Sequence, residues 1–491
     1  MCIFGGAWST GLNLRAASAQ CSHCLQAEKL LDHHWERCTS LGRLGLKKKS
    51  MLYLQFHHLP QEDQCFLETA VPEAHKPFSE REKCPSECCT DNITMGSLCA
   101  ANAKFCLDFF KELSKMKKNE NIFFSPLSLS AAFGMVLLGA RGNTLKQIEK
   151  VFHFGEVLTD ATQRTRYPSE KCEEAGGVHS QFQALLAAVG EPSPGCFLTT
   201  ANRLFGEITY PFFQQYLDST KKFYRAELEA VDFKYTKEEA REKINFWVEN
   251  ETKGKIKDLF AAGSIDPSTV LVLVNAIYFK GKWAVEFKKE DTKETYFRLN
   301  KNERKTVQMM FREGYFKLAI IEEPKIKVIE LPYFNNELSM LILLPEVVYE
   351  DFTGLEQLEN TLTYEKIAEW TSLDKMQQLT VKVYLPQFKM DESYVLNKTL
   401  QEMGVMNVFD WGKADLSGIS RKDGLVMSKA IHKSSVEVNE DGTEAVAATQ
   451  VVAMPLSRSI SYEFKADHPF LFFIRHNPTN TILFFGRYSS P

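Results

Sequence analysis

The chain lacks long apolar runs and an excess of basic residues. Its longest hydrophobic stretches are broken by Asn, Lys or Gly within about ten residues, whereas a membrane-spanning helix needs about 20. Lys and Arg number 59 against 63 Asp and Glu, which gives a formal net charge of −4. These values predict a soluble protein that has neither a membrane nor a nucleic acid as its partner.

Cysteine is scarce over most of the chain. Eight of the twelve cysteines precede Met95, and the four that follow it are Cys99, Cys106, Cys172 and Cys196. Neither Met1 nor Met95 begins a convincing signal peptide. Because this pattern is typical of a protein with reduced thiols, we expect a cytoplasmic location, with extracellular release by a non-classical route left open.

Residues 1–94 show no sustained periodicity. They contain Cys21, Cys24, His33, His34 and Cys38, residue types that suit tetrahedral Zn²⁺, but the spacing matches no zinc finger or knuckle. We therefore expect an N-terminal extension that is disordered, or wrongly included at the start of the chain, and a folded domain over 95–491. A zinc site is the weaker alternative.

Signatures of catalysis are also missing after Met95. The sequence has no glycine-rich phosphate loop, metal-ligand set or nucleophile elbow there, so we expect no cofactor, no metal and no enzyme activity. His432 could be imagined as a base with Ser125 or Ser128 as its nucleophile. A buried imidazole satisfied by hydroxyls and an amide is the stronger interpretation.

Helical periodicity dominates the first half of the folded domain. Phe105, Phe109 and Leu113 recur at four-residue spacing, which predicts an amphipathic helix. A second helix is expected after Ser125 and Pro126, since serine can cap a helix and proline suits its first turn.

Strand patterns accumulate in the second half. Residues 270–274 are continuously apolar, as in a strand buried on both faces, and residues 381–385 alternate between apolar and polar. A hairpin is expected around 335–336, between the strands 328–331 and 338–344. The mixture predicts the α+β class.

A run of small residues stands near the C-terminus. After Glu444 no acidic or basic residue appears until Arg458, and the intervening residues are rich in Ala, Val and Thr. Loops exposed to water usually carry Pro, Gly, Asn, Asp and charged residues. The small side chains that share one strand face are Thr443, Ala445, Ala447 and Thr449. The segment is therefore expected to be able to join a sheet.

Five separated motifs make the chain resemble the serpins, in particular their ovalbumin-like intracellular branch, clade B. The resemblance spans 95–491 and depends on 121–129 (NIFFSPLSL), 273–283 (LVNAIYFKGKW), 428–433 (SKAIHK), a hinge at Gly442, and 464–474 (FKADHPFLFFI). It implies an α+β serpin fold with three β-sheets, eight or nine helices and an exposed reactive-centre loop.

The resemblance also implies a function, that of a serine protease inhibitor acting as a suicide substrate. A protease would cleave the loop at about 440–463 and form a covalent acyl complex, after which the loop would insert into the main sheet. The implied hinge residues are Glu440, Gly442, Thr443, Ala445, Ala447 and Thr449. The alternative is a non-inhibitory serpin that acts as a binding or structural protein.

The cleaved bond is placed from both ends of the loop by the family's spacing. Fourteen positions beyond Gly442 is 442 + 14 = 456, and eight before Phe464 is 464 − 8 = 456, which selects the bond Leu456–Ser457. Leucine suits chymotrypsin-like or cathepsin G-like serine proteases, with some papain-like cysteine proteases left open. The rival specificity residue is Arg458, which would attract trypsin-like enzymes.

Other residues are implied to control movement of the sheet. By resemblance, a polar cluster called the shutter consists of Ser125, Ser128, Asn275 and His432. The breach, where insertion begins, is matched by Trp283 and Glu440. The implied assembly is a monomer whose partner is the target protease.

Overall fold

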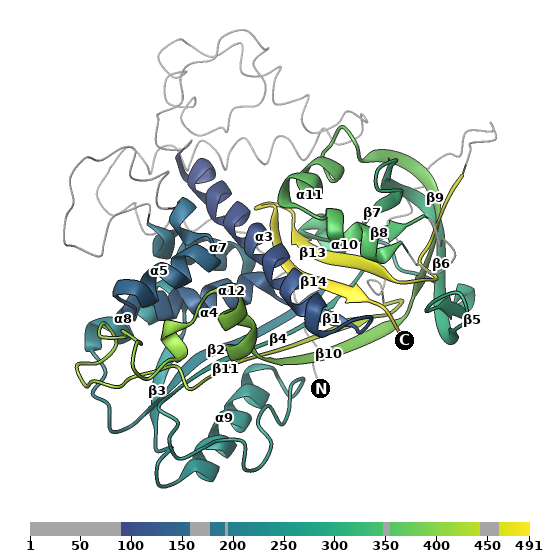
Figure 1. Ribbon diagram of the computed structural model, residues 1–491. Coiled ribbons are helices and arrows are strands. Elements are labelled where there is room, and N and C mark those ends of the chain that lie inside the picture. The colour runs from purple at the N-terminus through teal and green to yellow at the C-terminus, as the bar shows by residue number, and fades with distance from the viewer. Residues whose placement is uncertain (1–89, 158–176, 192–194, 347–353, 442–460) are drawn as a thin grey trace, which may run out of the picture. The chain divides into compact units, whose positions relative to one another are not determined.

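The computed structural model describes residues 90–157, 177–191, 195–346, 354–441 and 461–491 (Figure 1). These residues belong to one compact unit, Cys84–Pro491. The cysteines and histidines of the expected N-terminal extension lie outside the described residues. No helix in the described ranges combines the length and the apolar character needed to span a membrane.

The two predicted helices are confirmed. Helix α3 (Thr90–Met116) buries Phe105 and Phe109 completely. Helix α4 (Pro126–Gly139) begins at its predicted cap, because the Ser125 side chain accepts a hydrogen bond from the backbone N–H of Ser128. The other α-helices with described bounds are α5 (Gly142–Val151), α7 (Val178–Val189), α8 (Gln214–Tyr224), α9 (Lys237–Glu251), α10 (Leu355–Thr361), α11 (Tyr364–Trp370) and α12 (Leu396–Met403).

A five-stranded sheet forms one part of the fold (Figure 1). Its order is β10 (Phe388–Val395), β11 (Lys429–Val438), β4 (Leu271–Gly281), β2 (Cys196–Glu207) and β3 (Glu227–Val231). Alternate residues of β4 pack on opposite sides. Val272 and Val274 belong to a buried cluster that includes Ala240, Ile244 and Val248 of α9, whereas Leu271 and Leu273 join the main core. The sheet is therefore covered on both faces, as the apolar run predicted.

The remaining described strands form a larger hydrogen-bonded network. Its order is β1 (Ile122–Phe124), β14 (Thr481–Tyr488), β13 (Phe470–His476), β8 (Leu338–Pro345), β7 (Ile326–Pro332), β6 (Arg304–Ile321), β9 (Gln377–Pro386) and β12 (Tyr462–Lys465), and β5 (Lys293–Arg298) also pairs with β6. The 18-residue strand β6 pairs with β5, β9 and β7 in turn. Strand β6 therefore joins the strands from β1 to β7 to β9, β12 and β5, so the described strands form two hydrogen-bonded networks. The mixture of helices and strands confirms the α+β class.

The predicted hairpin is also confirmed. Strands β7 and β8 are antiparallel, and the turn between them holds Asn335 and Asn336 at φ of 62° and 57°. Asparagine tolerates this left-handed region better than most residues. In β9 the alternating residues Val381, Val383 and Leu385 are fully buried, as their pattern predicted.

Candidate functional site

The central feature is a pair of parallel strands with no strand between them. Strands β4 and β11 pair directly, from Val272 opposite Lys429 to Lys280 opposite Glu437. Their outer neighbours β2 and β10 are antiparallel to them. A segment running back from the end of β11 would be antiparallel to both β4 and β11 if it entered between them.

The four predicted shutter residues lie together beneath this pair. His432 of β11 and Asn275 of β4 are register partners, and His432 Nδ1 lies 2.5 Å from Asn275 Oδ1. The Asn275 amide nitrogen donates to Ser128 Oγ at 2.5 Å, and the backbone N–H of Ser125 donates to His432 Nε2 at 3.1 Å. The cluster thus connects both strands to the start of α4.

These contacts define the protonation state of His432. Nε2 accepts a hydrogen bond, so the ring proton is on Nδ1, where it is donated to Asn275. Burial lowers the pKa of His432 to about 3, so the ring is neutral at pH 7. Ser125 Oγ donates to the carbonyl of Leu483 at 2.6 Å and not to the imidazole. The geometry is that of a satisfied buried histidine rather than of a base activating a nucleophile.

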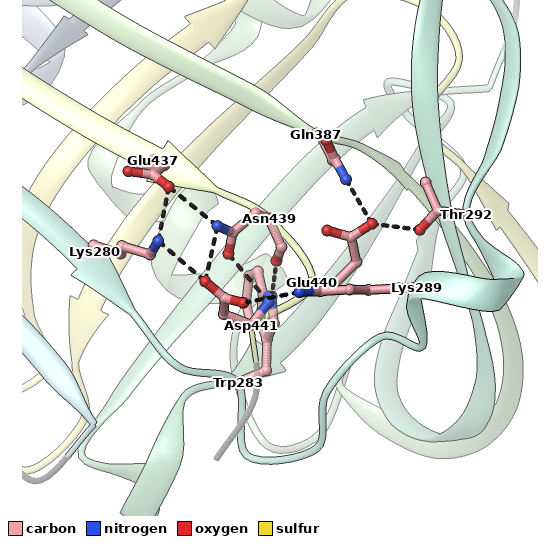
Figure 2. A network of polar contacts seen from close by, with 9 residues as sticks. All are labelled: Lys280, Trp283, Lys289, Thr292, Gln387, Glu437, Asn439, Glu440 and Asp441. Carbon is pink, nitrogen blue, oxygen red and sulfur yellow. Dashed lines mark hydrogen bonds and ion pairs between the residues drawn. The ribbon is translucent and has the colours of Figure 1, made fainter. Parts of the chain in front are cut away.

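Trp283 and Glu440, the predicted breach residues, lie in a second polar network where β11 ends (Figure 2). The indole nitrogen of Trp283 donates to the carbonyl of Asn439 at 2.8 Å, and its backbone N–H donates to the carbonyl of Asp441 at 3.3 Å. The indole also stacks on Tyr333, with ring centroids 4.5 Å apart and planes 8° apart. Trp283 therefore anchors the segment 439–441, where the described chain stops beyond β11.

Within the described residues, Glu440 forms no hydrogen bond with Trp283 and is held by side chains from other parts of the chain (Figure 2). Its Oε1 accepts hydrogen bonds from Thr292 Oγ1 at 2.6 Å and from Gln387 Nε2 at 2.5 Å. The residue is only 8% exposed, so these two donors compensate for much of the water that the carboxylate has lost.

Asp441 belongs to a charged group next to this site (Figure 2). Lys280 Nζ lies 3.1 Å from Asp441 Oδ2 and 2.7 Å from Glu437 Oε1. The hydrogen bond from Lys280 lowers the pKa of Asp441. Asn439 donates to both carboxylates from between them. The end of β11 is therefore tied to β4 by charge as well as by the ladder.

Sequence reasoning did not find several partners in this network, namely Lys280, Thr292, Gln387, Glu437, Asn439 and Asp441. Thr292 and Gln387 are 148 and 53 residues from Glu440 along the chain. The only local signal was the polar triplet 439–441 directly after a buried strand.

The predicted hinge and cleavage residues Gly442, Thr443, Ala445, Ala447, Thr449, Leu456, Ser457 and Arg458 lie outside the described residues. The described chain stops at Asp441, just beyond β11, and resumes at Ser461, just before β12. Within the described ranges, no group of three or more His, Cys, Asp or Glu side chains could hold a metal ion.

Comparison with known proteins agrees with this geometry. A family model described as serpin (serine protease inhibitor) matches residues 100–491. Human Serpin B4 is 51% identical over 398 residues, and the human leukocyte elastase inhibitor is 49% identical over 397 residues. In both cases the match covers 81% of this chain and 100% of the relative.

Solved structures give the same result. Uncleaved ovalbumin matches with a TM-score of 0.71 at 41% identity, and a cleaved, loop-inserted ovalbumin mutant matches with a TM-score of 0.70 at 40% identity. Each match covers 80% of this chain and 100% of the ovalbumin chain. The chain therefore belongs to the serpin family. Within that family it is similar to the ovalbumin-like clade B members, which confirms the resemblance.

Proposed function

We propose that this serpin is a suicide-substrate inhibitor of chymotrypsin-like or cathepsin G-like serine proteases, cleaved at Leu456–Ser457. The target protease would attack Leu456, form an acyl-enzyme and become trapped when the freed segment enters the five-stranded sheet. Arg458 stays the rival specificity residue, for trypsin-like enzymes. We further propose that the inhibitor is a cytoplasmic monomer, with non-classical release left open.

The direct parallel pairing of β4 and β11 carries the proposal. Parallel pairs are slightly less stable per residue than antiparallel pairs, and an inserted segment would replace one parallel ladder with two antiparallel ones. A strand of about a dozen residues contributes on the order of 10 kcal/mol from ladder hydrogen bonds, at a net ~1 kcal/mol each. Insertion therefore has a large driving force. The protease is trapped when insertion is also faster than hydrolysis of the acyl bond.

The test is to incubate the full chain separately with chymotrypsin, cathepsin G and trypsin. A complex that survives a denaturing gel, together with a released peptide beginning at Ser457, is expected for the first two proteases. A peptide beginning at Ser459 would move the specificity residue to Arg458. The same assay on a chain beginning at Met95 determines whether residues 1–94 contribute.

A matched control separates inhibition from simple cleavage. Ala445→Arg places a large charge on the face expected to enter the core, whereas Val446→Arg places the same charge on the opposite face. Ala445→Arg should be cleaved without forming a stable complex. Val446→Arg should still form a substantial fraction of the complex that survives a denaturing gel. Cleavage of the unmodified chain with no complex and no gain in thermal stability would favour the non-inhibitory alternative.

A further inference from the structure

One edge of the five-stranded sheet is only partly paired. Strand β3 is the last strand of this sheet, and it pairs with residues 203–207 of β2. The preceding residues of β2, 197–202, pair with β4 on their other side. Within the described ranges, no strand pairs with them on the side of β3. Because alternate residues of an antiparallel strand direct their N–H and C=O groups away from the neighbour, this edge presents unpaired backbone groups.

The sequence of the 197–202 edge does nothing to prevent further pairing. Native sheets protect exposed edges with charged residues, proline or β-bulges. The stretch reads FLTTAN, which has no charge and no proline, and Phe and Thr favour strands. Its register with β4 runs without a bulge from Cys196 opposite Gly281 to Gly206 opposite Leu271. The edge is therefore regular and suited to receive another strand.

A cavity of about 1050 Å³ lies beside this edge. Its lining includes Leu198 and Thr200 of the edge itself. The facing residues include Leu186 and Val189 of α7 and Trp247 of α9. Pockets for small ligands usually measure about 300–1,000 Å³, so this space is large enough for a short peptide segment.

The two walls of the cavity differ in character. Successive residues of β2 alternate between the main core, against which Leu198 packs, and the cluster with α9, which contains Ala201. Leu186 and Val189 lie on the side of the main core, whereas Trp247 packs against the cluster with α9. A strand added at the edge would therefore point its side chains alternately at an apolar wall and at the indole of Trp247.

Three buried polar atoms at this edge have no hydrogen-bond partner within the described part of the chain. They are Thr199 Oγ1, Asn202 Oδ1 and the indole nitrogen of Trp247. Buried polar groups in folded proteins are nearly always hydrogen-bonded, so each such group needs an explanation. An incoming segment supplies one, because its hydroxyl and backbone groups can accept from the indole N–H and donate to the two oxygens.

We propose that the 197–202 edge of β2 is a docking site for an extended segment of a partner protein, which adds as a strand in line with β3. The main chain of the segment pairs with β2, and its side chains give specificity, as in other cases of strand addition. The segment that fits alternates apolar residues, which face Leu186 and Val189, with hydroxyl-bearing residues, which face Trp247.

The test uses the full-length protein and a seven-residue peptide of alternating valine and serine, acetylated and amidated at its ends. Two derivatives carry N-methyl groups, one on every valine and the other on every serine. A strand pairs through the N–H groups of alternate residues. One derivative should therefore bind at least about tenfold more weakly than the parent peptide, and the other should bind about equally. Isothermal titration calorimetry measures the three affinities. Equal binding by all three peptides, or by none, would overturn the site.

Hydrogen exchange locates the bound peptide. Binding at the proposed site should slow exchange of the amides of 197–202 and leave those of β11 unchanged. Protection of the amides of β11 instead would place the peptide between β4 and β11, and would overturn the edge as its site.

A matched pair of variants tests the contact with the indole. Trp247→Phe removes the indole N–H and should weaken binding of the peptide several-fold. Trp411→Phe changes an exposed indole that does not line the cavity, so it should bind as the unmodified protein does. Thermal unfolding checks that both variants are folded. Equal affinities for the two folded variants would overturn the assigned contact.

Sedimentation velocity distinguishes a partner protein from a second copy of this chain. The proposal predicts that the protein sediments at the same rate with and without the peptide, apart from the added mass. Self-association that the peptide reverses would assign the edge to a second copy and overturn the partner.

Discussion

His432 and Asn275 hold together the two strands that would separate on insertion. They are opposite each other in the β4–β11 ladder, both are completely buried, and the imidazole donates to the amide oxygen. This bond and the parallel ladder around it must break before a new strand can enter.

Asn275→Ala should therefore make the sheet easier to open. The change removes the hydrogen-bond partner of two buried groups, the Nδ1–H of His432 and the Oγ of Ser128. We expect the free energy of unfolding to fall by about 2–4 kcal/mol. Urea denaturation measures that loss. The rate at which a synthetic peptide of the sequence 443–456 anneals into the uncleaved protein should rise.

Asn102→Ala is the matched control for that experiment. Asn102 is also buried and hydrogen-bonded, but it lies on α3 and donates to the carbonyl of Ile482. It should lower stability by a similar amount without accelerating annealing. Equal acceleration in both variants would mean that stability in general, and not the His432–Asn275 link, controls opening.

Stability should fall as the pH drops below neutral because of His432. Its pKa is lowered by burial to about 3 in the folded protein, from an ordinary value of 6.5. Between these two values the unfolded chain binds a proton at this residue and the folded chain does not. The contribution of the neutral imidazole to the free energy of unfolding is therefore complete above pH 6.5 and is lost progressively toward pH 3. From pH 7 to pH 5 the loss from this residue is about 2 kcal/mol.

The measurement is the free energy of unfolding in urea at pH 7, 6 and 5. His432→Gln cannot titrate in this range, so its stability should fall less steeply with decreasing pH than that of the unmodified protein. Parallel curves for the two proteins would contradict the assignment of a neutral, buried imidazole.

His153 should show the opposite dependence on pH. Its ring lies 2.9 Å from Asp108 of α3 and 3.1 Å from Glu156, and the hydrogen bond to Asp108 is the main cause of its raised pKa. A raised folded-state pKa stabilises the protein fully below pH 6.5 and loses its effect as the pH rises through that pKa. His153→Gln should lower the free energy of unfolding in urea by less than ~1 kcal/mol at pH 5.5, because solvent screens the contact. At pH 9, where the imidazole is neutral, the same substitution should change the free energy of unfolding very little.

Removal of one hydrogen-bond donor to Glu440 should loosen the segment 439–441 at the end of β11. Among the described residues, Gln387→Ala leaves the nearly buried carboxylate with Thr292 as its remaining hydrogen-bond donor, which we expect to lower the free energy of unfolding by about 1–2 kcal/mol. Amide hydrogen exchange near the end of β11 should accelerate. Thr361→Val, which removes a hydroxyl bonded only to helix carbonyls in α10, should leave that exchange unchanged.

Local patterns predicted much of the fold. The cap at Ser125, the buried strand at 270–274 and the Asn335–Asn336 hairpin depend on neighbours within a few residues, so periodicity and turn chemistry were sufficient. The four predicted shutter residues could be selected because they stand inside motifs that resemble the serpins, and the structure places them together. Gln387 and Thr292 have no such signal, since each is an ordinary polar residue until folding brings it to Glu440.

The sequence by itself determined the class of the fold and the family, and it contains the small-residue segment that we propose enters the sheet. Only the tertiary structure decided that β4 and β11 are adjacent and parallel, which nitrogen of His432 carries the proton, and that Ser461 lies within hydrogen-bond distance of Glu313 on β6. The reason is physical. Helix periods and turns arise from contacts between near neighbours, whereas these three features depend on strands that are distant in the chain and meet only when the whole core closes.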